Sequence, residues 1–141
     1  MNFWKLFHKL LDDGVAVKIV RLLSFWYSHM QEVRVRWQST LSAPFGIQNG
    51  TKQGGILSSY LFTRYIRDLL QQIIHSRVGY NIGGYMLNVL AYADDIVLLA
   101  PSWKALQFLL DLLDSSAADI DMLCNIRKTV CMVLHLNVVP R

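Results

Sequence analysis

Apolar side chains recur every three or four residues in four stretches of the chain, which is the spacing of one face of an α-helix. This pattern predicts helices at Phe3–Leu11, Val15–His29, Leu57–His75 and Ser102–Leu123. The expected buried positions of the last three helices are Val17, Val20, Leu22, Leu23 and Trp26, then Leu57, Leu61, Phe62, Tyr65, Ile66, Leu69, Leu70, Ile73 and Ile74, and finally Leu106, Leu109, Leu113, Ala117, Ile120 and Leu123.

The ends of these helices carry typical stop and start residues. Gly14 can adopt the left-handed conformation that ends the first helix, and Ser102 is a common type of N-cap for the fourth. Asp12 and Asp13 oppose the macrodipole at a helix C-terminus, so we interpret them as part of a solvated turn. The acidic residues expected on the solvent face of the fourth helix are Asp111, Asp114, Asp119 and Asp121.

Residues Glu32–Trp37 alternate between apolar and charged side chains, a period of two that predicts a half-buried strand. The apolar face consists of Val33, Val35 and Trp37. Arg34 and Arg36 lie on the opposite face, where we interpret them as solvated, with contact to phosphate as the alternative.

Apolar and β-branched runs predict further strands. Val78–Leu90 contains strand-like pieces around Gly83 and Gly84, which indicate a hairpin turn, and Thr129–Leu136 is expected to be a last strand. Together with the helices, these elements predict an α+β fold in which helices back an antiparallel sheet.

The stretch Val89–Ala100 places two adjacent carboxylates between apolar runs. We expect a β-hairpin with Asp94 and Asp95 at its turn, on the edge of the sheet, because burying unpaired carboxylates is costly. An Asp pair between strands often does no more than turn the chain. The alternative is that two carboxylates held at a rigid turn bind a metal cation.

A glycine-rich loop precedes the third helix. Gly50, Gly54 and Gly55 clear space for the close approach of another group, and the free N–H groups of the following helix face the same space. An anionic ligand would fit there, although the loop matches neither the GxxxxGKS nor the GxGxxG nucleotide-binding motif.

The composition predicts a single domain, part of whose surface is covered by other polypeptide. The chain has 141 residues, of which 53% are hydrophobic and 17% charged. Its mean hydropathy of +0.30 is high for a free-standing domain, so part of its surface should be covered by a partner or by further polypeptide. The net charge of +4 favours an anionic partner.

Other classes of protein are disfavoured. Charges interrupt the long apolar runs, so no membrane span is expected, and the first residues lack the cleavage site of a signal peptide. We therefore expect an intracellular protein, with cytoplasm and nucleus both left open. Cys124 and Cys131 lack the spacing of a zinc site or a disulfide framework and are expected to be core thiols, and the scattered histidines form no metal-binding pair.

Three stretches together resemble the palm domain of reverse transcriptases, most closely those of non-LTR retrotransposons and their group II intron relatives. Residues 92–95 read YADD, which is similar to the catalytic YADD motif. Residues 52–58 (KQGGILS) look like the loop and helix start that contact template and incoming nucleotide. Residues 125–129 (NIRKT) resemble the NxxKT segment beside the triphosphate, and the resemblance covers nearly the whole chain as one partial palm domain, residues 1–141.

The resemblance implies RNA-directed DNA polymerisation with two Mg²⁺ ions, an RNA template, a DNA primer and deoxynucleoside triphosphates. Asp94 would be the firmer metal ligand and Asp95 would assist, while Lys128 would neutralise or protonate the departing pyrophosphate. The residues implied to contact template or nucleotide are Lys52, Gln53, Gly54, Gly55, Tyr92 and Asn125.

The chain also departs from the family pattern. Ser59 stands where the family usually has Pro, and the family's other metal-binding Asp is expected on a strand before Met1. Fingers and thumb are likewise expected to be missing. We therefore expect weak Mg²⁺ binding and no polymerisation by this chain alone, with the missing parts of the parent polymerase as partners. The alternative function is a non-catalytic remnant that binds RNA or a protein partner.

Overall fold

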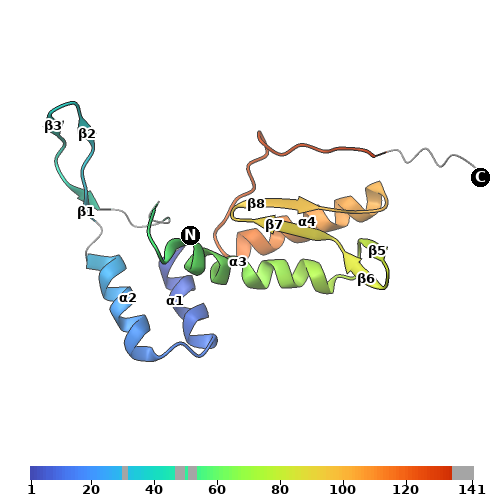
Figure 1. Cartoon of the computed structure of the whole chain (residues 1–141), viewed down its shortest axis with the longest axis horizontal. Helices are drawn as coiled ribbons and strands as arrows, with labels where there is room; N and C mark the ends of the chain where they lie inside the picture. The colour runs from blue at the N-terminus through green and yellow to red at the C-terminus, as the bar shows by residue number, and fades with distance from the viewer. Residues whose placement is uncertain (30–31, 47–49, 51–53, 135–141) are drawn as a thin grey trace, which may run out of the picture.

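The computed structural model describes residues 1–29, 32–46, 50 and 54–134. The fold of these residues is α+β, as predicted, and each of the four helices begins and ends within four residues of its predicted bounds. The helices are α1 (Phe3–Asp12), α2 (Val17–His29), α3 (Ser58–His75) and α4 (Trp103–Asp119) (Figure 1). The strands are β1 (Glu32–Val33), β2 (Arg36–Trp37), β3 (Thr40–Leu41), β4 (Phe45–Gly46), β5 (Tyr80–Ile82), β6 (Tyr85–Leu87), β7 (Val89–Tyr92) and β8 (Asp95–Leu98). None of the described helices is long and apolar enough to cross a bilayer.

Helix α3 is the centre of the fold, because α1, α4 and strand β7 all contact it (Figure 1). Its buried side chains confirm most of the predicted stripe: Leu61, Tyr65, Ile66, Leu69 and Ile73. The prediction is wrong at the two ends. Leu57 is 41% exposed because it precedes the helix, and Ile74 is 51% exposed because the last turn presents it to solvent.

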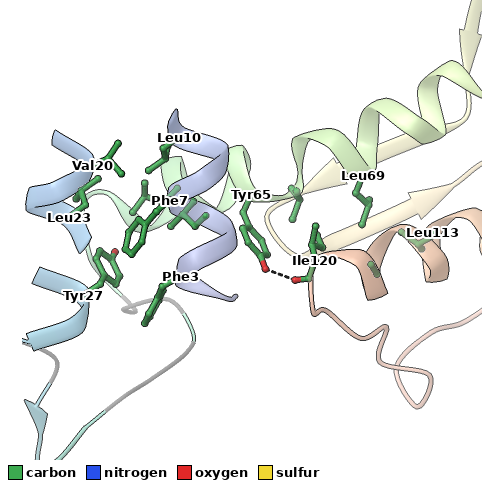
Figure 2. Packing of buried hydrophobic residues seen from close by; sticks show 14 of the residues in the cluster. Phe3, Phe7, Leu10, Val20, Leu23, Tyr27, Tyr65, Leu69, Leu113 and Ile120 are labelled. Atoms are coloured by element: carbon green, nitrogen blue, oxygen red, sulfur yellow. Dashed lines mark hydrogen bonds between the residues drawn. The ribbon is translucent and has the colours of Figure 1, made fainter. Parts of the chain in front are cut away.

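Tyr65 joins three helices through one hydroxyl group (Figure 2). The hydroxyl accepts a hydrogen bond from the backbone N–H of Asn2 (3.1 Å) and donates one to the backbone carbonyl of Ile120, directly after α4. Asn2 is also the N-cap of α1, where its Oδ1 accepts from the N–H groups of Trp4 and Lys5. Burial raises the pKa of Tyr65 above its ordinary value, so the hydroxyl stays protonated and able to donate.

The start of α1 also holds the segment that follows α4. Asn2 Nδ2 donates to Asp121 Oδ2 (2.9 Å), and Lys5 Nζ lies 2.9 Å from Asp121 Oδ1. Lys5 donates in addition to the backbone carbonyl of Asp119 (2.8 Å). The hydrogen bonds from Lys5 and then Asn2 lower the pKa of Asp121. Residues near the two ends of the described chain are thereby tied together.

The turn after α1 corrects the prediction for one of its two carboxylates. Asp12 is exposed as predicted, but the Asp13 carboxylate lies 2.5 Å from Nη2 of Arg67 and 3.5 Å from Nη1 of Arg64, both on α3. The two arginines offset the unfavourable position of Asp13 at a helix C-terminus. Gly14 has φ of 78°, which confirms the predicted left-handed stop.

Helix α2 packs against α1 through a face shifted from the predicted one. Its buried residues are Val20, Leu23 and Tyr27. The ring of Tyr27 makes edge contacts with Phe3 (4.8 Å between centroids) and Phe7 (6.3 Å). These aromatic contacts turn the Tyr27 side of α2 toward α1, so the prediction is wrong for three residues, which are 54, 65 and 41% exposed: Val17, Leu22 and Trp26.

Helix α4 confirms the middle of its predicted stripe. Its buried apolar residues are Leu109, Leu113 and Ala117, and Ile120 is buried just beyond its end. Ser102 is the N-cap, as predicted, because its Oγ accepts from the N–H of Ala105 (3.2 Å). The buried Ser116 donates from its Oγ to Oε1 of Gln72 (2.6 Å), which adds a polar link between α4 and α3.

The described strands form separate two-stranded antiparallel ribbons, so the predicted single sheet is corrected. The pairs are β1–β4, β2–β3, β5–β6 and β7–β8. The β5–β6 ribbon confirms the hairpin predicted at Gly83 and Gly84, and α3 and α4 back the β7–β8 ribbon. The half-buried strand predicted at Glu32–Trp37 is wrong, since it is broken into β1 and β2. Val35 and Trp37 are 55 and 76% exposed because this part projects away from the helices (Figure 1).

After α4 the chain leaves the core, and three predictions are corrected there. Leu123 is 91% exposed because the helix ends at Asp119. Cys124 and Cys131 are exposed free thiols rather than core residues. Residues 129–134 are not a strand, and residues 135 and 136 of the predicted strand lie outside the described residues.

Replacing Tyr65 by Phe should destabilise the fold, because it leaves the Asn2 N–H and the Ile120 carbonyl without their shared partner. We expect the free energy of unfolding to fall by about 1–3 kcal/mol, measured by urea denaturation with far-UV circular dichroism. The control is Tyr60→Phe, at an exposed position of α3, for which a change within about 0.5 kcal/mol is expected. Equal effects of the two substitutions would contradict the role assigned to Tyr65.

The ion pair between Lys9 and Asp68 should make stability depend on acid pH. Lys9 Nζ lies 2.5 Å from Asp68 Oδ2, and this hydrogen bond lowers the pKa of Asp68. In the unfolded chain the carboxyl titrates near ~3.9, so its stabilisation is present above that pH and is lost as the pH falls through the lower folded pKa.

We expect the difference in unfolding free energy between wild type and Asp68→Asn to be largest near neutral pH and to shrink as the pH falls below the ordinary range of an Asp carboxyl. Urea denaturation over a series of pH values measures it. Asp114→Asn, at an exposed position of α4, is the control. A difference that does not change with pH would show that the effect of Asp68 is not electrostatic.

Candidate active site

The β7–β8 ribbon is the acidic hairpin predicted at Val89–Ala100. Its register pairs Val89 with Leu98, Leu90 with Val97, Ala91 with Ile96, and Tyr92 with Asp95. Ala93 and Asp94 form the two-residue turn. The predicted turn position is therefore confirmed for Asp94 and corrected for Asp95, which is the first residue of β8. A two-residue loop is the favoured hairpin connection, and it starts one residue earlier than predicted.

The two faces of the acidic hairpin have different surroundings. The face toward α3 and α4 carries the half-buried Val89, Ile96 and Leu98. The opposite face carries the exposed Leu90, Tyr92, Asp95 and Val97. Paired residues of an antiparallel ribbon share a face, so the Asp95 carboxylate lies beside Tyr92, which is 84% exposed. The carboxylates thus occupy the open tip of a hairpin that helices support from behind.

The turn itself has a strained backbone. Ala93 has φ of 53°, in the left-handed region, whereas Asp94 does not share a positive φ. A positive φ at the first central residue alone matches a type II′ turn, whose twist suits a two-residue hairpin. An L-residue costs about 1–3 kcal/mol in such a conformation, and strain of this kind is common at functional sites.

Asn88 fixes the base of the acidic hairpin to α3. Its side chain is buried, and Nδ2 donates to the backbone carbonyl of Ile73 in the last turn of α3 (2.6 Å). Its own carbonyl accepts from the N–H of Leu99 (2.9 Å). Sequence reasoning missed this residue. The available signal was a polar side chain in an apolar, strand-like run between Leu87 and Val89.

The hairpin presents two carboxylates of the kind that bind metal ions. Carboxylate oxygens are the ligands that Mg²⁺ prefers, and Asp94 and Asp95 present two carboxylates to solvent. Within the described ranges, no group of three or more His, Cys, Asp or Glu side chains is placed to hold a metal ion. The residues present therefore fit one side of a magnesium site and do not complete it.

The glycine-rich loop is described only in part. Lys52 and Gln53 lie outside the described residues. Gly54 has φ of 76°, and a Cβ added there would meet no atom within 4 Å. The carbonyl of Gly55 accepts from the N–H of Ser58 at the start of α3 (3.0 Å). Backbone conformation therefore favours glycine at position 54, and the space beside it is open.

The NIRKT segment forms an exposed turn after α4. The backbone carbonyl of Asn125 accepts from the N–H groups of Lys128 and Thr129, each at 3.0 Å, and from the Thr129 hydroxyl at 2.9 Å. Asn125 and Lys128 are exposed. In the described part of the chain, no hydrogen bond or ion pair joins either residue to the acidic hairpin, and their roles stay predictions.

Comparison with known proteins identifies the family. The model of the reverse transcriptase (RNA-dependent DNA polymerase) family matches residues 3–138, a range that includes the acidic hairpin and the NIRKT turn. The chain belongs to this family, which confirms the resemblance seen in the sequence.

A relative places the chain within the family. Over 75 residues it is 39% identical to the Retrovirus-related Pol polyprotein from type-2 retrotransposable element R2DM of Drosophila melanogaster. The matched stretch makes up 53% of this chain and 7% of the relative, so the chain spans a small part of that protein. The reverse transcriptase domain is of the non-LTR type.

Substituting Asn88 by Ala should loosen the acidic hairpin from α3, because the Ile73 carbonyl loses its donor in a buried place. We expect the free energy of unfolding to fall by about 1–3 kcal/mol in urea denaturation, with faster amide hydrogen exchange in β7 and β8. Gln71→Ala, at an exposed position of α3, is the control and should change neither quantity. Unchanged exchange in β7 and β8 would rule out Asn88 as the anchor.

Proposed function

We propose that this chain is the palm part of a reverse transcriptase domain and that its acidic hairpin contributes two carboxylates to RNA-directed DNA polymerisation. One observation carries the proposal: Asp94 and Asp95 lie at the exposed tip of a hairpin backed by α3 and α4, in a chain of this family. A tip with rigid support suits catalysis, since catalytic groups on fixed elements keep their geometry.

The carboxylates have a defined role in this proposal. Reverse transcriptases use Mg²⁺, and two such ions held here would supply Lewis-acid stabilisation of the negative charge that develops during nucleotidyl transfer. Asp94 would be the firmer ligand, and Asp95 would assist. Both side chains are exposed and form no ion pair with the described residues, so their oxygens are free to bind a cation.

Residues outside the hairpin would hold the other reactants, which are an RNA template, a DNA primer and deoxynucleoside triphosphates. Lys128 would place its positive charge beside the departing pyrophosphate. The residues proposed to contact template or nucleotide are Lys52, Gln53, Gly54, Gly55, Tyr92 and Asn125. The open space beside Gly54 and the exposure of Tyr92 support this assignment.

The incomplete donor set leads us to propose that the chain alone does not polymerise. Mg²⁺ needs several oxygens held at once, and a further carboxylate would have to come from another part of the parent polymerase. Strands β7 and β8 pair with each other and with no third described strand, which leaves backbone groups at the hairpin edges. Such an edge can accept the additional strand that would carry this carboxylate.

A non-catalytic role is the second candidate. A remnant that binds RNA or a protein partner needs no complete metal site, which agrees with the two-carboxylate donor set among the described residues. The exposed apolar side chains of Leu90 and Val97 on the open face of the hairpin would suit a protein partner.

Primer extension separates the two candidates. With Mg²⁺, an RNA template, a DNA primer and deoxynucleotides, we expect no extension by this chain alone. Extension should appear in a longer protein that restores the strand bearing the upstream Asp. In that protein Asp94→Asn should reduce the rate at least about 100-fold, because even indirect metal-site substitutions cost 10–100-fold.

The control in the longer protein is Asp111→Asn, which exchanges an exposed carboxylate on α4. Robust template-dependent extension by the present chain would contradict the proposed incompleteness. Absence of extension in both proteins, together with salt-sensitive RNA binding that Asp94→Ala leaves unchanged, would favour the non-catalytic remnant.

A further inference from the structure

Residues 32–46 form a narrow ribbon that projects away from the helices (Figure 1). We call these residues the basic ribbon. At its base β1 pairs with β4, and at its tip β2 pairs with β3, with Arg36 opposite Leu41 and Trp37 opposite Thr40. Gln38, in the two-residue turn, has φ of 53°. The N–H of Ser42 donates to the carbonyl of Val35 (2.9 Å), which continues the ribbon between the two strand pairs.

The side chain of Trp37 does not pack into the hydrophobic core. Its side chain is 76% exposed, and no aromatic ring or cation among the described residues stacks on it. The exposed Trp4 and Trp26 differ, because each has an aromatic neighbour on its own helix, Phe7 and Tyr27 respectively. A free indole at the tip of a ribbon offers a large flat surface to a ligand.

Two arginines precede this tryptophan in the ribbon. Arg34 and Arg36 are exposed, and neither forms an ion pair with a described residue. Arg36 donates from Nε to the carbonyl of Gln38 (3.3 Å), which holds its side chain near the turn at the tip of the ribbon. Residues 33–67 include no Asp or Glu, and the nearest carboxylate in the sequence, Glu32 at the base of the ribbon, forms no ion pair with either arginine.

The distribution of charged residues along the chain also favours an anionic ligand at the ribbon. Residues 1–67 contain nine Lys and Arg against three Asp and Glu, whereas residues 68–141 contain five against seven. The basic ribbon therefore belongs to the positive half of the sequence and the acidic hairpin to the negative half. A polyanion is attracted to the former, and arginines beside a free aromatic ring are typical of single-strand binding.

We propose that the basic ribbon binds single-stranded nucleic acid, with a base stacked on Trp37 and with Arg34 and Arg36 on the neighbouring phosphates. The register places Trp37 and Arg36 on opposite faces of the ribbon. The bound nucleic acid must therefore pass over the edge of the ribbon to reach both side chains. An unpaired strand is required because a base inside a duplex cannot stack on a side chain. This site lies outside the acidic hairpin. The inference rests on the proposed function, because it places an unpaired strand such as a template on the ribbon, and primer extension by the longer protein tests that function separately.

The test measures binding of a short fluorescein-labelled single-stranded RNA to the full chain by fluorescence anisotropy at several salt concentrations. Trp37→Ala should weaken binding about tenfold and leave the salt dependence unchanged, while Trp37→Phe should keep most of the affinity. The double substitution of Arg34 and Arg36 by Gln should reduce the slope of log K against log salt by about 1.4, because each phosphate contact on a single strand contributes about 0.7.

Two controls isolate the ribbon. Trp103→Ala removes a tryptophan that is 66% exposed on α4, and it should leave RNA affinity unchanged. Gln71→Ala, at an exposed position of α3 outside the ribbon, should also bind like wild type. A single-stranded DNA of the same sequence shows whether the sugar matters, and a duplex competitor should be much weaker.

The proposal is overturned if the chain binds no single strand, if Trp37→Ala and Trp103→Ala have the same effect, or if duplex and single strand compete equally. Circular dichroism checks that the variants fold, which is expected because Trp37 is outside the core. Should Trp37→Ala alter the spectrum, Trp37→Leu keeps apolar volume without an aromatic face, and wild-type affinity of that variant would likewise overturn the proposal.

Discussion

The hydroxyl of Tyr65 is the contact on which the arrangement of the helices depends. It is the meeting point of the first residues of α1, the middle of α3 and the end of α4, and each of its two partners is a backbone group. A backbone group buried without a partner costs about 1–3 kcal/mol, so the three elements are constrained to meet at one point. The same helix α3 then holds the acidic hairpin through Asn88, eight residues beyond Tyr65 at Ile73. The orientation of the candidate active site thus follows from the packing of a helix that contributes no residue to it.

Much of the fold could be predicted because helix periodicity and turn residues are local properties. The four helices, the cap at Ser102 and the stop at Gly14 were found in this way. Long-range partners are not encoded locally. Nothing near Asp13 in the sequence indicates its two arginines on α3, and the contact of Tyr27 with α1 is invisible to a count of apolar residues. Residues 129–134 are apolar and β-branched, but a strand requires a neighbour to pair with, and composition does not provide one.

The candidate site shows the same division. The residue types at Asp94 and Asp95 and their place between apolar runs indicated the hairpin, with cation binding as one of two interpretations of the Asp pair. The residue that anchors the hairpin, Asn88, could have been noticed only as a polar interruption. The left-handed backbone of Ala93 could not have been found from composition, because alanine rarely adopts it and no local feature requires it. The tertiary structure therefore adds the support and the strain of the candidate site, while its two carboxylates are visible in the sequence.

The link between Asn2 and Asp121 has a consequence for how the chain acquires its structure during synthesis. The two residues are 119 positions apart, and Tyr65 and Ile120 must also be present before the start of α1 is complete. At about 5–20 residues per second, a ribosome needs on the order of ten seconds between making the first and the second partner. The ring contacts of Tyr27 with Phe3 and Phe7 can form earlier, because all three residues precede α3. The link between the start of α1 and the segment after α4 can therefore form only after translation has passed Asp121.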